Sequence, residues 1–69
     1  MRTFNFFIED DRYAVPTLAF VSAQNQRVAR ELAWRRLSES PHHLAIEVCD
    51  GDELLVRLER NDRAAAKAS

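Results

Sequence analysis

Residues 43–60 have the sequence HLAIEVCDGDELLVRLER and carry the clearest structural signal in the chain. Hydrophobic and polar residues alternate on both sides of Asp50-Gly51, and this period is that of a β-strand. Asp-Gly favours the two-residue turn of a β-hairpin, because both central positions of that turn require positive φ. The stretch therefore predicts two antiparallel strands. The inward residues are expected to be Leu44, Ile46, Val48, Leu54, Val56 and Leu58.

A second hairpin is predicted near the start of the chain. Residues 3–9 alternate in the strand period, and residues 10–12 form a polar break typical of a solvated turn. Residues 13–21 are then rich in β-branched and aromatic side chains, but Pro16 interrupts them. Proline cannot donate a backbone hydrogen bond, so this strand is expected at a sheet edge, bent or broken at Pro16. The inward residues of the first strand are Phe4, Phe6 and Ile8.

The period changes to that of a helix after residue 22. Ser22 is a candidate N-cap, because its hydroxyl can accept a hydrogen bond from an N–H of the first turn. Residues 23–38 suit a helix, and Pro41 ends it by disfavouring helical geometry in the residue before it. The apolar half of the helical wheel comprises Val28, Ala29, Leu32, Ala33 and Leu37.

This order predicts an α+β fold of ββαββ type, a four-stranded sheet with one helix packed on one face. The helix connects the second and third strands, which therefore run in the same direction. Residues 1–60 are expected to form the single domain, and residues 61–69 a flexible C-terminal tail. The other face of the sheet is more apolar than a solvated face requires, since it is expected to carry Phe7, Ala45, Cys49 and Leu55.

Length and cysteine content bear on stability and location. A chain of 69 residues has a marginal core and usually needs a disulfide, a metal or a partner chain. Cys49 is the single cysteine, so it cannot close an intramolecular disulfide, and a lone thiol fits a reducing cytoplasm. No apolar run is long enough to span a membrane, and the start of the chain lacks a cleavable signal pattern. A second copy or a protein partner is therefore the expected source of additional stability.

Charge argues against a dedicated nucleic-acid binder. Ten basic residues face eleven acidic ones, whereas such binders usually show a basic surplus that neutralises phosphates. The alternative is a weak nucleic-acid-binding or antitoxin-like regulatory module that uses an arginine-rich helix face. That face would comprise Arg27, Arg30, Arg35 and Arg36.

Catalytic, metal and cofactor sites are not expected. The acidic turns at residues 10–11 and 50–52 fall at opposite ends of the predicted sheet, roughly 20 Å apart, so they cannot form one carboxylate pair. His42 and His43 would point to opposite faces, and six residues separate His43 from Cys49. Gly51 is the only glycine, which excludes a phosphate-binding loop. We therefore expect a non-enzymatic protein with no cofactor and no metal, and the sequence identifies no small-molecule ligand.

Trp34 is the most informative single residue. It falls outside the apolar arc and lies near Arg27 and Arg30, a composition typical of an interface hot spot. The alternative is a flanking ring that covers the helix and stacks on a neighbouring arginine. The candidate interface comprises Trp34, Arg27, Arg30, Phe7 and Leu55, and the expected partner is a second copy or another protein.

Three segments together resemble a family of short bacterial proteins of unknown function. They are the aromatic first strand at residues 4–10, the helix containing residues 29–33, and the Asp-Gly hairpin at residues 45–55. The resemblance covers about residues 3–58 and implies the ββαββ fold, with no catalytic residues to transfer. The chain departs from the family within residues 11–22. A looser likeness, at the level of the fold, is to the small partial RNase-H-like domain of HicB-type antitoxins, which bind a toxin partner.

Overall fold

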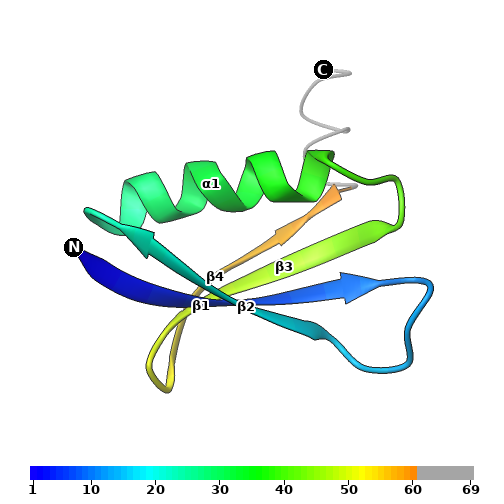
Figure 1. Ribbon diagram of the computed structural model, residues 1–69, viewed down its shortest axis with the longest axis horizontal. Helices are drawn as coiled ribbons and strands as arrows, with labels where there is room; N and C mark the ends of the chain where they lie inside the picture. The colour runs from blue at the N-terminus through cyan, green and yellow to red at the C-terminus, as the bar shows by residue number, and fades with distance from the viewer. Residues whose placement is uncertain (61–69) are drawn as a thin grey trace.

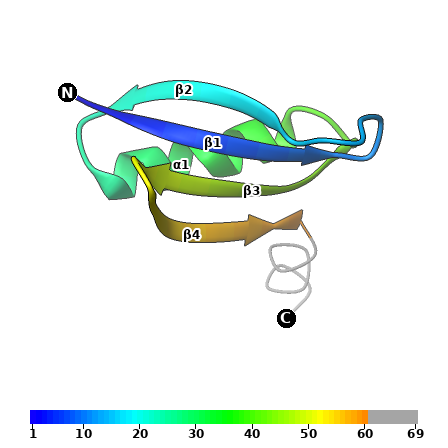
Figure 2. The ribbon, with the colours of Figure 1, turned by 90° about the horizontal axis from the view of Figure 1, so that it is seen from below.

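The computed structural model describes residues 1–60, and these form a four-stranded antiparallel sheet with one helix across one face (Figure 1). The strand order is β2-β1-β3-β4, so β2 and β4 lie at the two edges (Figure 2). The predicted α+β, ββαββ fold is confirmed, whereas the predicted tail at residues 61–69 lies outside the described residues. The elements are β1 (Arg2–Asp10), β2 (Thr17–Ala23), α1 (Gln26–Ser38), β3 (His43–Asp50) and β4 (Glu53–Glu59).

The core lies between α1 and the two central strands. The inward row of β1 is paired with that of β3, Phe6 opposite Val48 and Ile8 opposite Ile46, and all four side chains are buried. The helix meets this row with Ala29 and Ala33, whose small side chains let its backbone approach the aromatic rings. The predicted inward residues of β1 and the centre of the predicted helix face are therefore confirmed.

Strand β2 begins one residue after Pro16 and lies at the predicted edge. The strand expected over residues 13–21 is thus displaced toward the C-terminus, and residues 13–15 belong to the loop instead. Proline supplies the physical reason, since it ends the pairing on its N-terminal side. The pairing with β1 then continues as far as Ala23 opposite Arg2.

The predicted N-cap at Ser22 is wrong, because Ser22 pairs with Thr3 inside β2. The cap is Asn25, which is extended at φ −157°, and its Oδ1 accepts a hydrogen bond from the backbone N–H of Val28 at 3.0 Å. Strand pairing through Ala23 keeps the chain extended, so the helix starts three residues later than the sequence pattern indicates.

Two irregularities in the second hairpin change which side chains face inward. In β3 the register shifts at Leu44, which is exposed rather than inward. In β4 it shifts at Leu55, and this residue packs against the core while Leu54 is exposed. The predicted orientation of both leucines in β4 is therefore wrong, because a bulge reverses the alternation that the prediction assumed.

The turn of this hairpin is also displaced by one residue. Asp50 pairs with Glu53, so the two turn residues are Gly51 and Asp52 rather than Asp50 and Gly51. Gly51 adopts φ 61°, which glycine reaches without the steric cost of a Cβ atom.

Two side chains from distant segments bind the C-terminal end of α1. Nδ1 of His43 donates to the carbonyl of Arg36 at 2.8 Å, and the guanidinium of Arg60 donates to the carbonyls of Leu37 and Ser40. The Arg36 carbonyl also accepts from the backbone N–H of Glu39, and the Ser40 carbonyl accepts from that of His43, so the two side chains add to the hydrogen bonding at the helix end. Arg60 thereby fixes the end of β4 against the helix.

We expect the substitution Asn25→Ala to destabilise the protein by about 1 kcal/mol, because it removes the cap of the first helical turn. The matched substitution Ser22→Ala should change stability by less than about 0.5 kcal/mol, since Ser22 is an exposed strand residue. Urea unfolding followed by circular dichroism measures both. An equal loss in the two variants would contradict the assignment of the cap.

Candidate functional site

A buried carboxylate fixes the loop that leads into β2. Asp10 ends β1 and is only 6% exposed. It accepts three hydrogen bonds from Arg12, at 2.9 Å from the backbone N–H, 3.0 Å from Nε and 2.7 Å from Nη2. The side-chain hydrogen bond with Arg12 lowers the pKa of Asp10 well below its usual range, although burial opposes this.

The prediction that Asp10 belongs to a solvated turn is wrong. The inward row of β1 continues through Asp10, so its side chain points to the helix side of the sheet. The alternation of Phe4, Phe6 and Ile8 extended by one more step could have located it.

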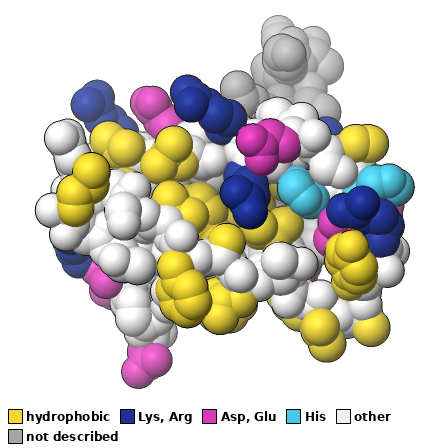
Figure 3. Space-filling view, viewed as in Figure 1, with side chains coloured by type: hydrophobic (Ala, Val, Ile, Leu, Met, Phe, Trp, Pro, Cys, Tyr) yellow, Lys and Arg dark blue, Asp and Glu magenta, His cyan; other side chains and the backbone are white. Residues whose placement is uncertain are grey.

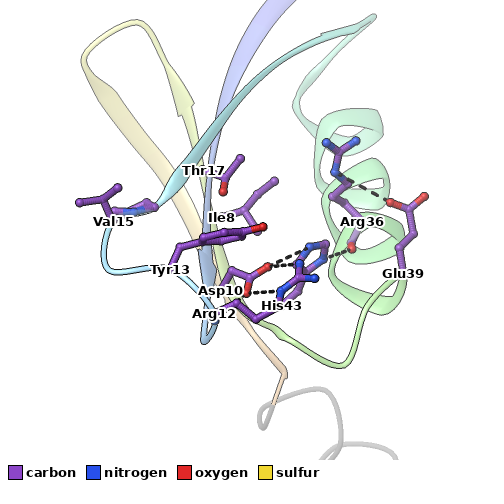
Figure 4. A pocket seen from close by; sticks show the side chains of 10 residues that line it. Ile8, Asp10, Arg12, Tyr13, Val15, Thr17, Arg36, Glu39 and His43 are labelled. Atoms are coloured by element: carbon purple, nitrogen blue, oxygen red, sulfur yellow. Dashed lines mark hydrogen bonds and ion pairs between the residues drawn. The ribbon is translucent and has the colours of Figure 1, made fainter.

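His43 connects this carboxylate to the helix. Because the Arg36 carbonyl can only accept, Nδ1 of His43 carries the proton, and Nε2 lies 3.8 Å from Oδ2 of Asp10. Figure 4 shows Asp10 joined by dashed lines to Arg12 and His43, with the Tyr13 ring beside them. The arrangement joins the end of β1, the following loop and the C-terminal end of α1.

A hollow of about 580 Å³ lies next to this cluster. Two of its charged side chains are already engaged: Arg12 is bound by Asp10, and Nε of Arg36 lies 3.8 Å from Glu39. An ionised, arginine-bound Asp10 cannot donate a proton near neutral pH, so the cluster acts as a clamp on the loop. The lining residues are Ile8, Asp10, Arg12, Tyr13, Val15, Pro16, Thr17, Arg36, Glu39 and His43.

The potential metal ligands are dispersed. Nδ1 of His42 contacts Asp11 at 2.8 Å, whereas Cys49 lies near the opposite end of β3 from His43. Burial, followed by the charge of Glu47, raises the pKa of the Cys49 thiol, which disfavours the nucleophilic thiolate. Within residues 1–60, no group of three His, Cys, Asp or Glu side chains is arranged to hold a metal ion.

The most distinctive surface of the molecule is β2 and the loop before it. None of the basic or acidic residues falls within residues 13–26, although charged residues make up 30% of the chain. Phe20 is 71% exposed and Leu18 is 48% exposed, and the loop adds Tyr13 and Val15. Figure 3, which views the molecule onto β2, shows hydrophobic side chains spread across this side.

The face of the sheet opposite α1 divides into an apolar and a charged part. Phe7 lies half-buried opposite Leu18, and Asn5 lies opposite Phe20, so the apolar part belongs to β1 and β2. Arg57 occupies the other part, where its guanidinium binds Glu9 at 2.7 Å and Glu47 at 3.2 Å. No described element covers this face (Figure 2).

The five residues of the predicted interface lie in three places. Arg27 and Arg30 are exposed on α1, and Trp34 is half-buried against the core, which corrects its expected position outside the apolar arc. Phe7 lies on the opposite face of the sheet, and Leu55 packs against the core. Leu18 and Phe20 are not among the predicted interface residues, and their outward position follows from their register opposite Phe7 and Asn5.

Comparison with protein-family models, with curated proteins and with solved structures finds no match for this chain. Within residues 1–60, α1 is too short and too polar to cross a membrane. Inferences about function therefore depend on the surfaces described above.

The Asp10 clamp predicts a pH dependence. A lowered pKa in the folded state stabilises the protein above the ordinary carboxyl pKa of about 3.9, and this stabilisation is lost as the pH falls below that value. At pH 7, Asp10→Asn should therefore be less stable than the parent protein, and the difference should shrink by pH 3. Urea midpoints at the two pH values measure this.

The control variant is Asp52→Asn, which changes an exposed turn carboxylate. It should leave the pH dependence of the parent protein almost unchanged. If Asp10→Asn lost stability between pH 7 and pH 3 as steeply as the parent protein does, Asp10 would not be the group responsible.

Proposed function

We propose that this protein is a non-enzymatic interaction domain that associates through β2 and the adjoining apolar surface. The observation that carries the proposal is the combination of an edge strand without charge and two exposed hydrophobic side chains, Leu18 and Phe20. An edge strand presents unpaired backbone N–H and C=O groups to any strand that approaches. Within residues 1–60, no strand pairs with the outer edge of β2.

Protection against such pairing is absent from β2 itself. Natural edge strands carry charges, bulges or prolines that keep other strands away. Strand β4 has such features, a bulge at Leu55 and the charges of Glu53, Arg57 and Glu59, whereas Pro16 precedes β2 and leaves its seven residues regular. The absence of these protective features favours β2 as an association surface over a solvated edge.

The Asp10 clamp supports the same proposal. Its three hydrogen bonds hold the first turn of the loop that precedes β2, and pairing with β1 holds the strand itself, so the edge is fixed before a partner arrives. A fixed surface loses less conformational entropy when it binds. A single cysteine, Cys49, with no second cysteine in the chain to pair with, supports a cytoplasmic location.

Phe20→Glu should convert the associated protein to monomer, because it places a charge at the centre of the proposed surface. Leu54→Glu is the control, since it alters an exposed leucine on β4. Size exclusion with light scattering at about 100 μM should show association for the parent protein and for Leu54→Glu only. A monomeric parent protein at that concentration would end the proposal of self-association.

A further inference from the structure

We propose that two copies join through their β2 strands, antiparallel about a two-fold axis at Phe20, to form one continuous eight-stranded sheet. This inference rests on the proposed function and names both the partner and the geometry. The partner is a second copy of this chain rather than a strand of another protein.

Charge favours a second copy as the occupant. A two-fold axis places only the residues next to it beside their own counterparts, so a charged residue close to the axis meets a like charge. The seven residues of β2, TLAFVSA, contain no charged side chain and therefore meet their own copy without repulsion. Strand β4, with two glutamates and one arginine, does not meet this condition.

The length of the strand fixes the register. Phe20 is the middle residue of Thr17–Ala23, so an axis at Phe20 pairs the whole strand with its copy. Leu18 then lies opposite Ser22 of the second copy, and Ala19 lies opposite Val21. In this register, each pair of opposed residues lies on the same face of the joined sheet. Shifting one strand by a single residue would oppose residues from different faces.

Pairing of the two β2 strands, here called the β2 seam, would cover exposed apolar side chains on both faces of the joined sheet. On the outer face, Phe20 packs beside its own counterpart and Leu18 beside the second copy's strand. On the helix side, a shallow hollow at this edge is floored by Phe6 and Val21 and bordered by Leu32 and the charged side chains of Arg35, Arg36 and Glu39. A second copy covers Val21, which is only partly buried in the single chain.

A disulfide trap tests the register directly. In a Cys49→Ala background, the double variant Leu18→Cys with Ser22→Cys should form a covalent dimer under mild oxidation. Directly opposed residues have Cα atoms about 4.5–5.5 Å apart, within the range that a disulfide spans. Within one chain the two cysteines lie four residues apart along a strand, roughly 13 Å, so they cannot join each other.

Each single variant serves as a matched control. With the axis at Phe20, Leu18→Cys alone and Ser22→Cys alone place their thiols roughly 13 Å from the same residue of the second copy. Both should remain non-covalent. A covalent dimer in either single variant as abundant as in the double variant would overturn the register.

A second measurement keeps Leu18 and Ser22 intact. Phe20→Glu and Phe20→Lys should each be monomeric, and their mixture should form a one-to-one heterodimer because opposite charges then meet at the axis. A parent protein that associates while the double cysteine variant does not crosslink and the mixture stays monomeric would overturn the β2 seam. Self-association itself would then stand, whereas a monomeric parent protein would overturn both.

Discussion

The packing of α1 on the central strands governs the rest of the structure. Ala29 and Ala33 are completely buried against the sheet, so the helix backbone lies close to the rings of Phe4 and Phe6. One helix of 13 residues covers a single face of the sheet and pairs with neither of its edge strands. The opposite face and the edge at β2 are therefore left exposed by the same packing that forms the core.

A small domain with one covered face has little apolar area with which to offset the entropy of folding. Residues 1–60 compensate in part through side chains that bind backbone carbonyls and through the ion pair between the buried Asp10 and the half-exposed Arg12. These contacts lie at the C-terminal end of the helix and in the first hairpin loop. They hold together the end of the molecule at which β2 begins. The contacts that stabilise the fold therefore also help to position this edge strand.

Alternation of hydrophobic and polar residues was sufficient to predict the number, order and type of the elements. It failed where the backbone leaves the regular period, at Leu44 and Leu55, because a bulge depends on pairing between strands rather than on local sequence. The cap at Asn25 was missed for a similar reason, since pairing of β2 with β1 extended the strand past Ser22. Local propensity yields to tertiary pairing at such boundaries.

The candidate surface was harder to predict than the fold. The predicted interface included Trp34 because tryptophan is prominent at interfaces, and the structure places this side chain half-buried against the core. The uncharged stretch at residues 13–26 was visible in the sequence, but its significance depends on β2 being an edge, with Phe20 on the face away from the helix. That information comes only from the register of the sheet.

Amide hydrogen exchange in β2 tests most directly whether this strand is the association surface. In an isolated edge strand, alternate N–H groups point to solvent and exchange quickly. If β2 is the seam, those amides should become protected as the protein concentration rises from about 1 μM to 1 mM, while amides of β4 keep their rates. Rates in β2 that stay fast and independent of concentration would contradict the account.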